Sequence, residues 1–238
     1  MENKRESLKN EVWEKYLTTC YKFRNKLTQR DFENYASICD RAYRKLLPQN
    51  KQARILDIGC GTGHFLYYLE KIGYTNHYGI DISPEQVEFV KNNITQRAET
   101  ADVFEYLKAK NDQFDAIVGN DIIAHIPKDS TLSFLNLIYS SLKPNGKCIL
   151  RTDNMDMPFP VKLRYVDFTI QTGYTESSFA QILRIAKFDD VRVFPFPLRR
   201  SSKVVWTLRK FFVYKLLLGV SFNSPSGAII GIGIKGSP

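Results

Sequence analysis

Three closely spaced glycines make the stretch ILDIGCGTGHF the part of the sequence with the clearest chemical potential. Gly59, Gly61 and Gly63 directly follow an apolar run, and glycine lets a backbone loop approach a ligand closely. The GxGxG spacing differs from the GxGxxG of dinucleotide loops, because His64 stands where a small residue would be needed. No GK[ST] of a phosphate loop follows either. The loop therefore predicts a nucleotide-like ligand that lacks a pyrophosphate.

Two carboxylates flank this loop. Asp57 lies just before the glycines, and Asp81 closes the next expected strand, 22 positions after Gly59. A carboxylate at that distance can accept hydrogen bonds from both hydroxyls of a ribose. Together with the glycines, the pair predicts a ligand with a ribose and a cationic or amino-acid tail.

His125 is the candidate general base. It follows an expected strand at residues 114–119, and the carboxyl ends of such strands open onto the ligand crevice. Imidazole titrates near neutral pH, which suits a group that takes a proton from an acceptor. A histidine that packs over the ligand or caps the next helix would explain the residue equally well. His64 and His77 are assigned no chemical role.

The elements that must position these residues alternate along the chain. Residues 1 to about 47 have helical spacing of aromatic residues, and strand and helix patterns follow. We expect strands at 53–58, 76–81, 97–101, 114–119 and 147–152, and helices at 62–72, 84–94 and 129–142. Strands that alternate with helices predict an α/β fold with a doubly wound, mostly parallel sheet.

The ordered motifs resemble those of the class I S-adenosylmethionine-dependent methyltransferases. ILDIGCGTG resembles their first motif, YGIDIS their ribose-binding strand end, FDAIVGNDIIAHIP their fourth-strand motif, and LKPNGKCILRT their turn and fifth strand. The match runs in the right order over about residues 50–152. It implies S-adenosylmethionine as cofactor and S-adenosylhomocysteine as product. It also implies a seven-stranded Rossmann-like sheet with an antiparallel last strand at 227–235.

The resemblance also assigns the cofactor-binding residues. Asp57, Gly59 and Gly61 would cradle the methionine part, Asp81 the ribose, and Asp102 the adenine amino group. The expected cofactor-binding set is Asp57, Gly59, Cys60, Gly61, Gly63, Asp81, Ile82, Asp102, Val103 and Asn120.

Residues 154–188 resemble the acceptor region of bacterial methyltransferases found with polysaccharide biosynthesis, where patterns similar to RYVDFT at 164–169 and YTES at 174–177 recur. This resemblance favours O-methylation of a sugar hydroxyl in a cell-surface glycan or its lipid-linked or nucleotide precursor. Asp167, expected as a catalytic residue beside His125, and Arg164 could orient the sugar. An ion pair between them that fixes a lid explains them equally well.

The chain departs from that family at two places. Ile170-Gln171 replace a frequent His-Glu pair, so a proton-transfer role for that pair is absent here. Ala124 replaces a frequent Glu before His125, so the carboxylate that would support the histidine is missing.

Other functions remain as alternatives. One is methylation of a small metabolite or natural product, and another is a non-catalytic module that binds the cofactor without transferring its methyl group. A nucleic-acid substrate would suit the pI of about 9.3. It is not expected, because the fourth-strand motif NDII differs from the NPPY-like motif that grips a flipped base. The acceptor is therefore expected to be a small molecule or a glycan.

A magnesium site is the last alternative. Asp121, Asp153 and Asn154 stand near the strand ends where catechol-type methyltransferases place magnesium. Each is one residue late in register, and oxygen ligands alone are a weak signal, so no metal is expected.

The net charge of +9 is concentrated at the C-terminal end, because residues 191–238 hold eight basic residues and no acidic one. Residues 199–220 read as a basic, aromatic amphipathic helix. It would either contact a membrane surface peripherally or cover the sheet. The N-terminus does not resemble a signal peptide, and four scattered cysteines indicate a reducing compartment, so the cytoplasm is expected.

Three regions are expected. Residues 1–48 form an N-terminal helical cap. Residues 49–198 form the cofactor-binding core, with an acceptor lid at 153–180. Residues 199–238 hold the basic helix, as a C-terminal insertion, and the final strand. The sequence does not indicate an oligomeric state.

Overall fold

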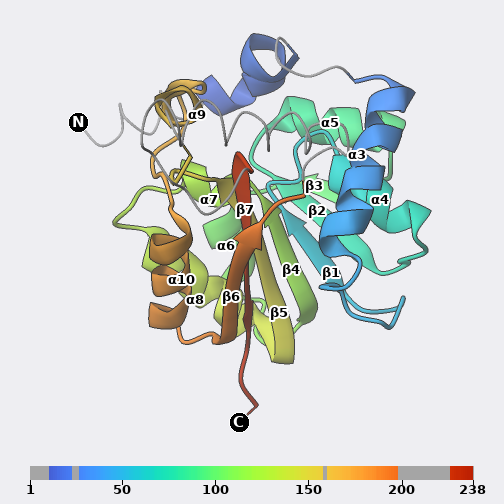
Figure 1. Ribbon diagram of the computed structural model, residues 1–238. Coiled ribbons are helices and arrows are strands. Elements are labelled where there is room, and N and C mark those ends of the chain that lie inside the picture. Colours follow the sequence, from blue (N-terminus) through green and yellow to red (C-terminus); the bar gives the residue numbers. More distant parts are fainter. Residues whose placement is uncertain (1–10, 23–26, 158–159, 198–225, 238) are drawn as a thin grey trace.

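A seven-stranded sheet of order β3-β2-β1-β4-β5-β7-β6 forms the centre of the protein (Figure 1). The structure is a computed structural model that describes residues 11–22, 27–157, 160–197 and 226–237. The strands are β1 (Ile55–Ile58), β2 (His77–Asp81), β3 (Ala98–Thr100), β4 (Phe114–Asn120), β5 (Leu142–Asp153), β6 (Asp189–Pro195) and β7 (Ala228–Ile234). Strands β1 to β5 pair in parallel, and β7 pairs antiparallel with β5 and β6. The predicted doubly wound sheet with an antiparallel last strand is confirmed.

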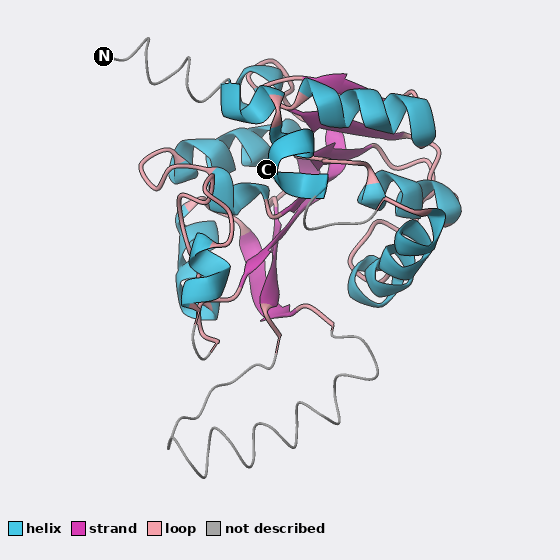
Figure 2. Cartoon of the chain, turned by 90° about the horizontal axis from the view of Figure 1, so that it is seen from above, coloured by secondary structure: helices cyan, strands magenta, loops and turns pink. Residues whose placement is uncertain are grey.

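Helices cover both faces of this sheet (Figure 2). Helices α3 (Gln29–Tyr43), α4 (His64–Lys71) and α5 (Pro84–Asn93) pack on one face. The other face carries α6 (Val103–Leu107), α7 (Ile122–His125), α8 (Thr131–Ser141) and α10 (Glu176–Ile185). Because both faces are covered, the central strands are buried at nearly every position, as β1 with all four residues buried illustrates.

The strand order reverses beside β1, which lies between β2 and β4. Ligands in doubly wound sheets bind at such a switch point, outside the carboxyl ends of the strands. Two segments far apart in sequence lie above that edge: the N-terminal residues 11–22, with the π-helical turn η1 (Leu17–Tyr21), and α9 (Val161–Tyr165) (Figure 1). A hydrogen bond from the Tyr16 hydroxyl to Asp167 joins them.

One predicted feature needs correction, and another lies outside the described residues. The expected turn at 143–146 is part of β5, which begins at Leu142 and shifts register between Phe114 and Ala116 of β4. The predicted basic helix at 199–220 lies outside the described residues. Within the described residues, no helix combines the length and apolar character needed to cross a bilayer.

Candidate active site

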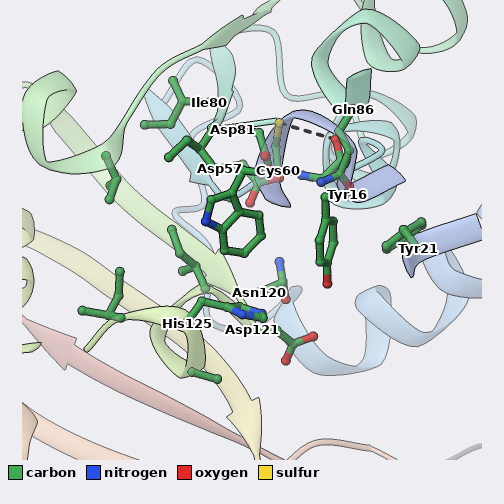
Figure 3. Close-up of a pocket in the computed structure, with 18 of the residues that line it drawn as sticks. Tyr16, Tyr21, Asp57, Cys60, Ile80, Asp81, Gln86, Asn120, Asp121 and His125 are labelled. Carbon is green, nitrogen blue, oxygen red and sulfur yellow. Dashed lines mark hydrogen bonds between the residues drawn. The ribbon is translucent and has the colours of Figure 1, made fainter. Parts of the chain in front are cut away.

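A cavity of about 480 Å³ opens at the carboxyl edge of the sheet, between β1, β2, β4, the N-terminal residues 11–22 and the loop that follows α9. Asp57, Asp81 and Gln86 lie on one side and Asn120, Asp121 and His125 on the other, with Tyr16 between them (Figure 3). Eleven of the twelve sequence-predicted site residues line this cavity: Asp57, Gly59, Cys60, Gly61, Asp81, Ile82, Asp102, Val103, Asn120, His125 and Asp167.

Gly63 is the exception. It is the N-cap of α4 with φ of +81°, and a Cβ there would lie 3.0 Å from Val90 Cγ2 on α5. The third glycine therefore permits the tight turn and the close packing of α4 on α5, and it does not face the cavity. The sequence pattern alone gave no way to separate this role from ligand contact.

The glycine loop is shaped by Asp81 and Gln86. Gly61 has φ of +54°, its N–H donates to Asp81 Oδ2 at 2.8 Å, and a Cβ on it would lie 3.2 Å from Gln86 Oε1. Gln86 Oε1 is buried and has no hydrogen-bond partner. Gly61 has no side chain to block the approach of a ligand, and Gln86 Oε1 next to it can accept a hydrogen bond. Both features suit a ligand that carries N–H or O–H donors.

Asp57 is a buried carboxylate, 1% exposed, whose two oxygens have no hydrogen-bond partner. Burial raises its pKa, the nearby charge of Asp81 raises it further, and Arg151 lowers it in part. An unpaired buried carboxylate is costly unless a cation or donor joins it. The position therefore fits a cationic ligand group, such as the ammonium of an amino-acid tail.

Asp81 is also buried, but both of its oxygens accept backbone hydrogen bonds. Oδ1 accepts from Ser83 N at 2.9 Å and Oδ2 from Gly61 N. Burial raises the pKa of Asp81, and these backbone donors offset part of that rise. Each oxygen has a further lone pair, so Asp81 can hold the loop and still accept from ribose hydroxyls.

Replacing Asp81 with asparagine is expected to weaken binding of S-adenosylmethionine about tenfold, because one charge-assisted hydrogen bond of about 1.5 kcal/mol is lost. Isothermal titration calorimetry on the two proteins measures this. Glu99→Gln on the neighbouring strand β3 removes one charge from a second pocket that shares no lining residue with the cavity, and it serves as the control. Unchanged affinity in Asp81→Asn would exclude Asp81 from the ligand site.

Asp102 lines the part of the cavity that follows β3. It is the N-cap of α6, and its Oδ1 accepts from Phe104 N at 2.8 Å and Glu105 N at 3.3 Å. Ile80, Val103 and Phe104 complete this part of the cavity. These apolar side chains next to one carboxylate suit the expected adenine ring and amino group.

The opposite wall contains a partly buried ion pair. Asp121 has φ of +68° at the end of β4, and its carboxylate pairs with Arg151 of β5. Asn120 accepts a hydrogen bond from the Tyr43 hydroxyl and leaves its amide nitrogen unpartnered. Among the described residues, no three His, Cys, Asp or Glu side chains gather as metal ligands would.

His125 stands at the end of α7 in a hydrogen-bonded chain. Its Nδ1 lies 2.9 Å from the Thr169 hydroxyl, which donates to Asp167 Oδ1 at 2.6 Å. The Tyr16 hydroxyl donates to Asp167 Oδ2. Burial raises the pKa of Asp167, but the hydrogen bonds from Thr169 and Tyr16 outweigh it, so the pKa lies below its ordinary value.

The hydrogen bonds from His125 through Thr169 to Asp167 fix the tautomer of His125. An ionised Asp167 can only accept, so the single hydroxyl hydrogen of Thr169 points to it and the Thr169 oxygen accepts from His125 Nδ1–H. The neutral ring then has its lone pair on Nε2, the atom a general base needs.

The expectation that His125 lacks a supporting carboxylate is therefore wrong. Asp167 supplies one through Thr169, from 42 positions further along the chain. Arg164 contacts the loop that follows α9. Its guanidinium donates to the backbone oxygens of Ile170 at 2.7 Å and Gln171 at 2.8 Å, so it holds the loop in place.

The N-terminal residues supply cavity walls that sequence reasoning did not identify. Trp13 lies edge-on to His125, with ring centroids 5.4 Å apart, and 5.0 Å from the ring of Tyr16. Thr18 binds the carboxylate of Glu85 through its backbone N–H and its hydroxyl, which ties this segment to α5. The helical spacing of Trp13, Tyr16 and Tyr21 indicated a shared face, but not that this face covers the cavity.

The sheet order, the antiparallel β7 and the glycine loop after β1 together define a class I methyltransferase fold. The chain belongs to the methyltransferase domain family, whose model matches residues 30–193. This confirms the prediction of a class I methyltransferase domain with S-adenosylmethionine as its cofactor.

Known methyltransferases and related enzymes are similar to this chain over different shares of their length. Cyclopropane-fatty-acyl-phospholipid synthase of Escherichia coli is 32% identical over 102 residues, which is 42% of this chain and 26% of the synthase. Phosphoethanolamine N-methyltransferase of Plasmodium falciparum is 28% identical over 174 residues, 67% of this chain and 64% of that enzyme. A SAM-dependent methyltransferase from Archaeoglobus fulgidus superposes with a TM-score of 0.68 at 22% identity, covering 92% of this chain and 99% of that one. The chain thus spans about a quarter of the synthase and under two thirds of the Plasmodium enzyme.

Proposed function

We propose that this protein methylates a hydroxyl of a small polar acceptor and that His125 is the general base. The observation that carries the proposal is the hydrogen-bonded chain from His125 Nδ1 through Thr169 to Asp167. A hydroxyl must lose its proton as it is methylated, and a neutral histidine with a free Nε2 can accept that proton. Asp167 stabilises the imidazolium that results, so it acts through Thr169 as a positioning residue.

The cofactor is proposed to lie along the glycine loop. S-adenosylmethionine supplies an activated methyl group on a sulfonium when bound. Asp57 would pair with the ammonium of its methionine part, and Gly59 and Gly61 would let that part approach the loop closely. Asp81 would bind the ribose, and Asp102 would face the adenine. The unpartnered oxygens of Asp57 support this placement.

A sugar hydroxyl, in a glycan or its precursor, is the acceptor proposed first. The resemblance of residues 154–188 to methyltransferases found with polysaccharide biosynthesis supports it. The aromatic edge of Trp13 beside His125 supports it as well, since sugars present C–H faces that pack on aromatic rings.

An amine is the second candidate, and two observations favour it. Trp13, Tyr16 and Tyr21 line the cavity with aromatic rings, which attract cationic nitrogen. The similar Plasmodium enzyme is named for N-methylation of phosphoethanolamine.

Label transfer separates these acceptors. The full chain would be incubated with methyl-labelled S-adenosylmethionine and with two panels of acceptors, sugars and nucleotide sugars in one, ethanolamine and its phosphate in the other. Mass spectrometry then locates the methyl group. Label on a sugar oxygen that disappears in His125→Gln supports the proposal. Label on nitrogen establishes the amine, and cofactor binding without any transfer overturns both.

A further inference from the structure

The amino-acid tail of S-adenosylmethionine carries a carboxylate on the same carbon as its ammonium. With the ammonium at Asp57, this carboxylate must lie in the same part of the cavity. Six aspartates line the cavity: Asp57, Asp81, Asp102, Asp121, Asp153 and Asp167. Like charges repel each other, so a carboxylate that enters among them needs a cationic side chain as its partner.

Arg151 is the only lysine or arginine among the described residues that line this cavity, and its side chain is 15% exposed. Within the described part of the chain, its guanidinium makes one hydrogen bond, from Nη2 to the Asp121 carboxylate. Its Nε is buried and has no hydrogen-bond partner. A guanidinium has five N–H groups in a fork that matches a carboxylate. Arg151 therefore has donors left for a ligand after it has paired with Asp121.

The register of the sheet places Arg151 and Asp57 on the same face. Asp57 pairs with Val118 of β4, and Val118 pairs with Ile149 of β5. Paired residues of parallel strands point to the same side of the sheet, and so does the residue two positions further along, which is Arg151. Asp57 and Arg151 are therefore two strands apart, about 10 Å across the sheet, with Arg151 nearer the carboxyl edge. An amino acid fits between them, with its ammonium toward Asp57 and its carboxylate toward Arg151.

Neighbouring side chains hold the guanidinium in place. The rings of Tyr35 and Phe196 have their centroids 5.9 Å and 5.0 Å from Arg151 Cζ, and aromatic faces attract cations. Asp121 holds the guanidinium through the ion pair. Because the side chain is already ordered, a ligand loses little affinity to the cost of immobilising it. The charge of Arg151 also reaches Asp57, since it lowers the pKa of that carboxyl in part.

We propose that Arg151 binds the carboxylate of the methionine part of S-adenosylmethionine and makes the protein selective for a cofactor with an intact amino-acid tail. This rests on the proposed place of the cofactor along the glycine loop. It does not depend on whether the acceptor is a hydroxyl or an amine, because the carboxylate belongs to the cofactor. Asp57 and Arg151 then recognise the two opposite charges of the tail.

Calorimetry with two ligands, in the absence of an acceptor, tests this. The full chain is titrated with S-adenosylhomocysteine and with S-adenosyl-3-thiopropylamine, which has the same structure without the carboxylate. We expect S-adenosylhomocysteine to bind at least about tenfold more tightly, because its carboxylate accepts charge-assisted hydrogen bonds. Arg151→Gln, whose amide can still donate to Asp121, should weaken binding of S-adenosylhomocysteine by about tenfold or more. Its affinity for the amine analogue should stay within about threefold of that of the intact protein, which also shows that the fold is retained.

Two further variants complete the test. Asp121→Asn is the matched control, because it removes the ion pair but keeps the guanidinium, and it should retain the preference for S-adenosylhomocysteine. Arg151→Lys keeps the charge without the fork and should reduce the preference severalfold, which provides a test even where Arg151→Gln does not fold.

Three results would overturn the proposal. One is an intact protein that binds both ligands equally, and another is an equal loss of both ligands in Arg151→Gln, which would make Arg151 structural only. The third is an unchanged preference in Arg151→Gln or Arg151→Lys, which would leave the donors of Arg151 to an anionic group of the acceptor. Each of these leaves methyl transfer by His125 standing, whereas an intact protein that binds neither ligand would refute the proposed place of the cofactor itself.

Discussion

Replacement of His125 by glutamine is expected to lower the turnover number by about 10²–10⁴-fold, the usual effect of losing a general base. Glutamine keeps a similar length and hydrogen-bonding capacity but cannot accept a proton near neutral pH. The affinity for S-adenosylmethionine should change little, because His125 lies across the cavity from Asp57 and Asp81 (Figure 3). Single-turnover kinetics and calorimetry on the same preparations measure the two quantities separately.

Thr169 offers a matched pair of variants for the same step. Thr169→Val removes the hydroxyl that joins His125 to Asp167 with almost no change in volume, and the lost tautomer control should slow turnover about tenfold or more. Thr169→Ser restores the hydroxyl and should recover most of the rate. Equal rates in the valine and serine variants would show that the hydrogen-bonded chain does not position His125. Normal turnover in His125→Gln would return His125 to a structural role.

The cofactor side of the fold is predictable from sequence because its signals are local. A buried apolar run before the glycines, and a carboxylate at the end of the next run, lie within about thirty residues of each other. The strands at 55–58, 77–81 and 114–120 therefore lie within the predicted ranges or extend them by one residue. Gly63 shows the limit, since both a ligand loop and a tight helix start require glycine there.

The acceptor side could not be predicted in the same way. The contact between Tyr16 and Asp167 joins residues 151 positions apart, and that between His125 and Thr169 joins residues 44 apart. No local sequence pattern indicates which polar residues will form hydrogen bonds with each other after folding. The missing glutamate before His125 suggested an unsupported histidine, whereas the carboxylate arrives from a distant loop.

Asp57→Asn is expected to weaken binding of S-adenosylmethionine by about 3 kcal/mol or more, which is a factor of at least about 10². The variant leaves the ammonium of the ligand opposite a neutral amide in a buried place, so the loss exceeds that at Asp81, where backbone donors share the carboxylate. Calorimetry measures the affinity. Asp102→Asn, at the place proposed for the adenine, is the comparison and should lose less.

The same substitution should stabilise the protein without its cofactor, by about 1 kcal/mol or more at neutral pH, because a buried carboxylate without a partner becomes a neutral amide. Burial raises the pKa of Asp57 above its ordinary value. A carboxyl group with a raised pKa contributes stability below its unfolded pKa of about 3.9 and loses that contribution as the pH rises through the folded value. The free energies of unfolding of the two proteins should therefore converge near pH 4 and separate as the pH increases. Denaturant unfolding at several pH values measures this, and a variant that binds the cofactor normally, or is less stable at every pH, would refute the role of Asp57 as the unpaired partner of a cation.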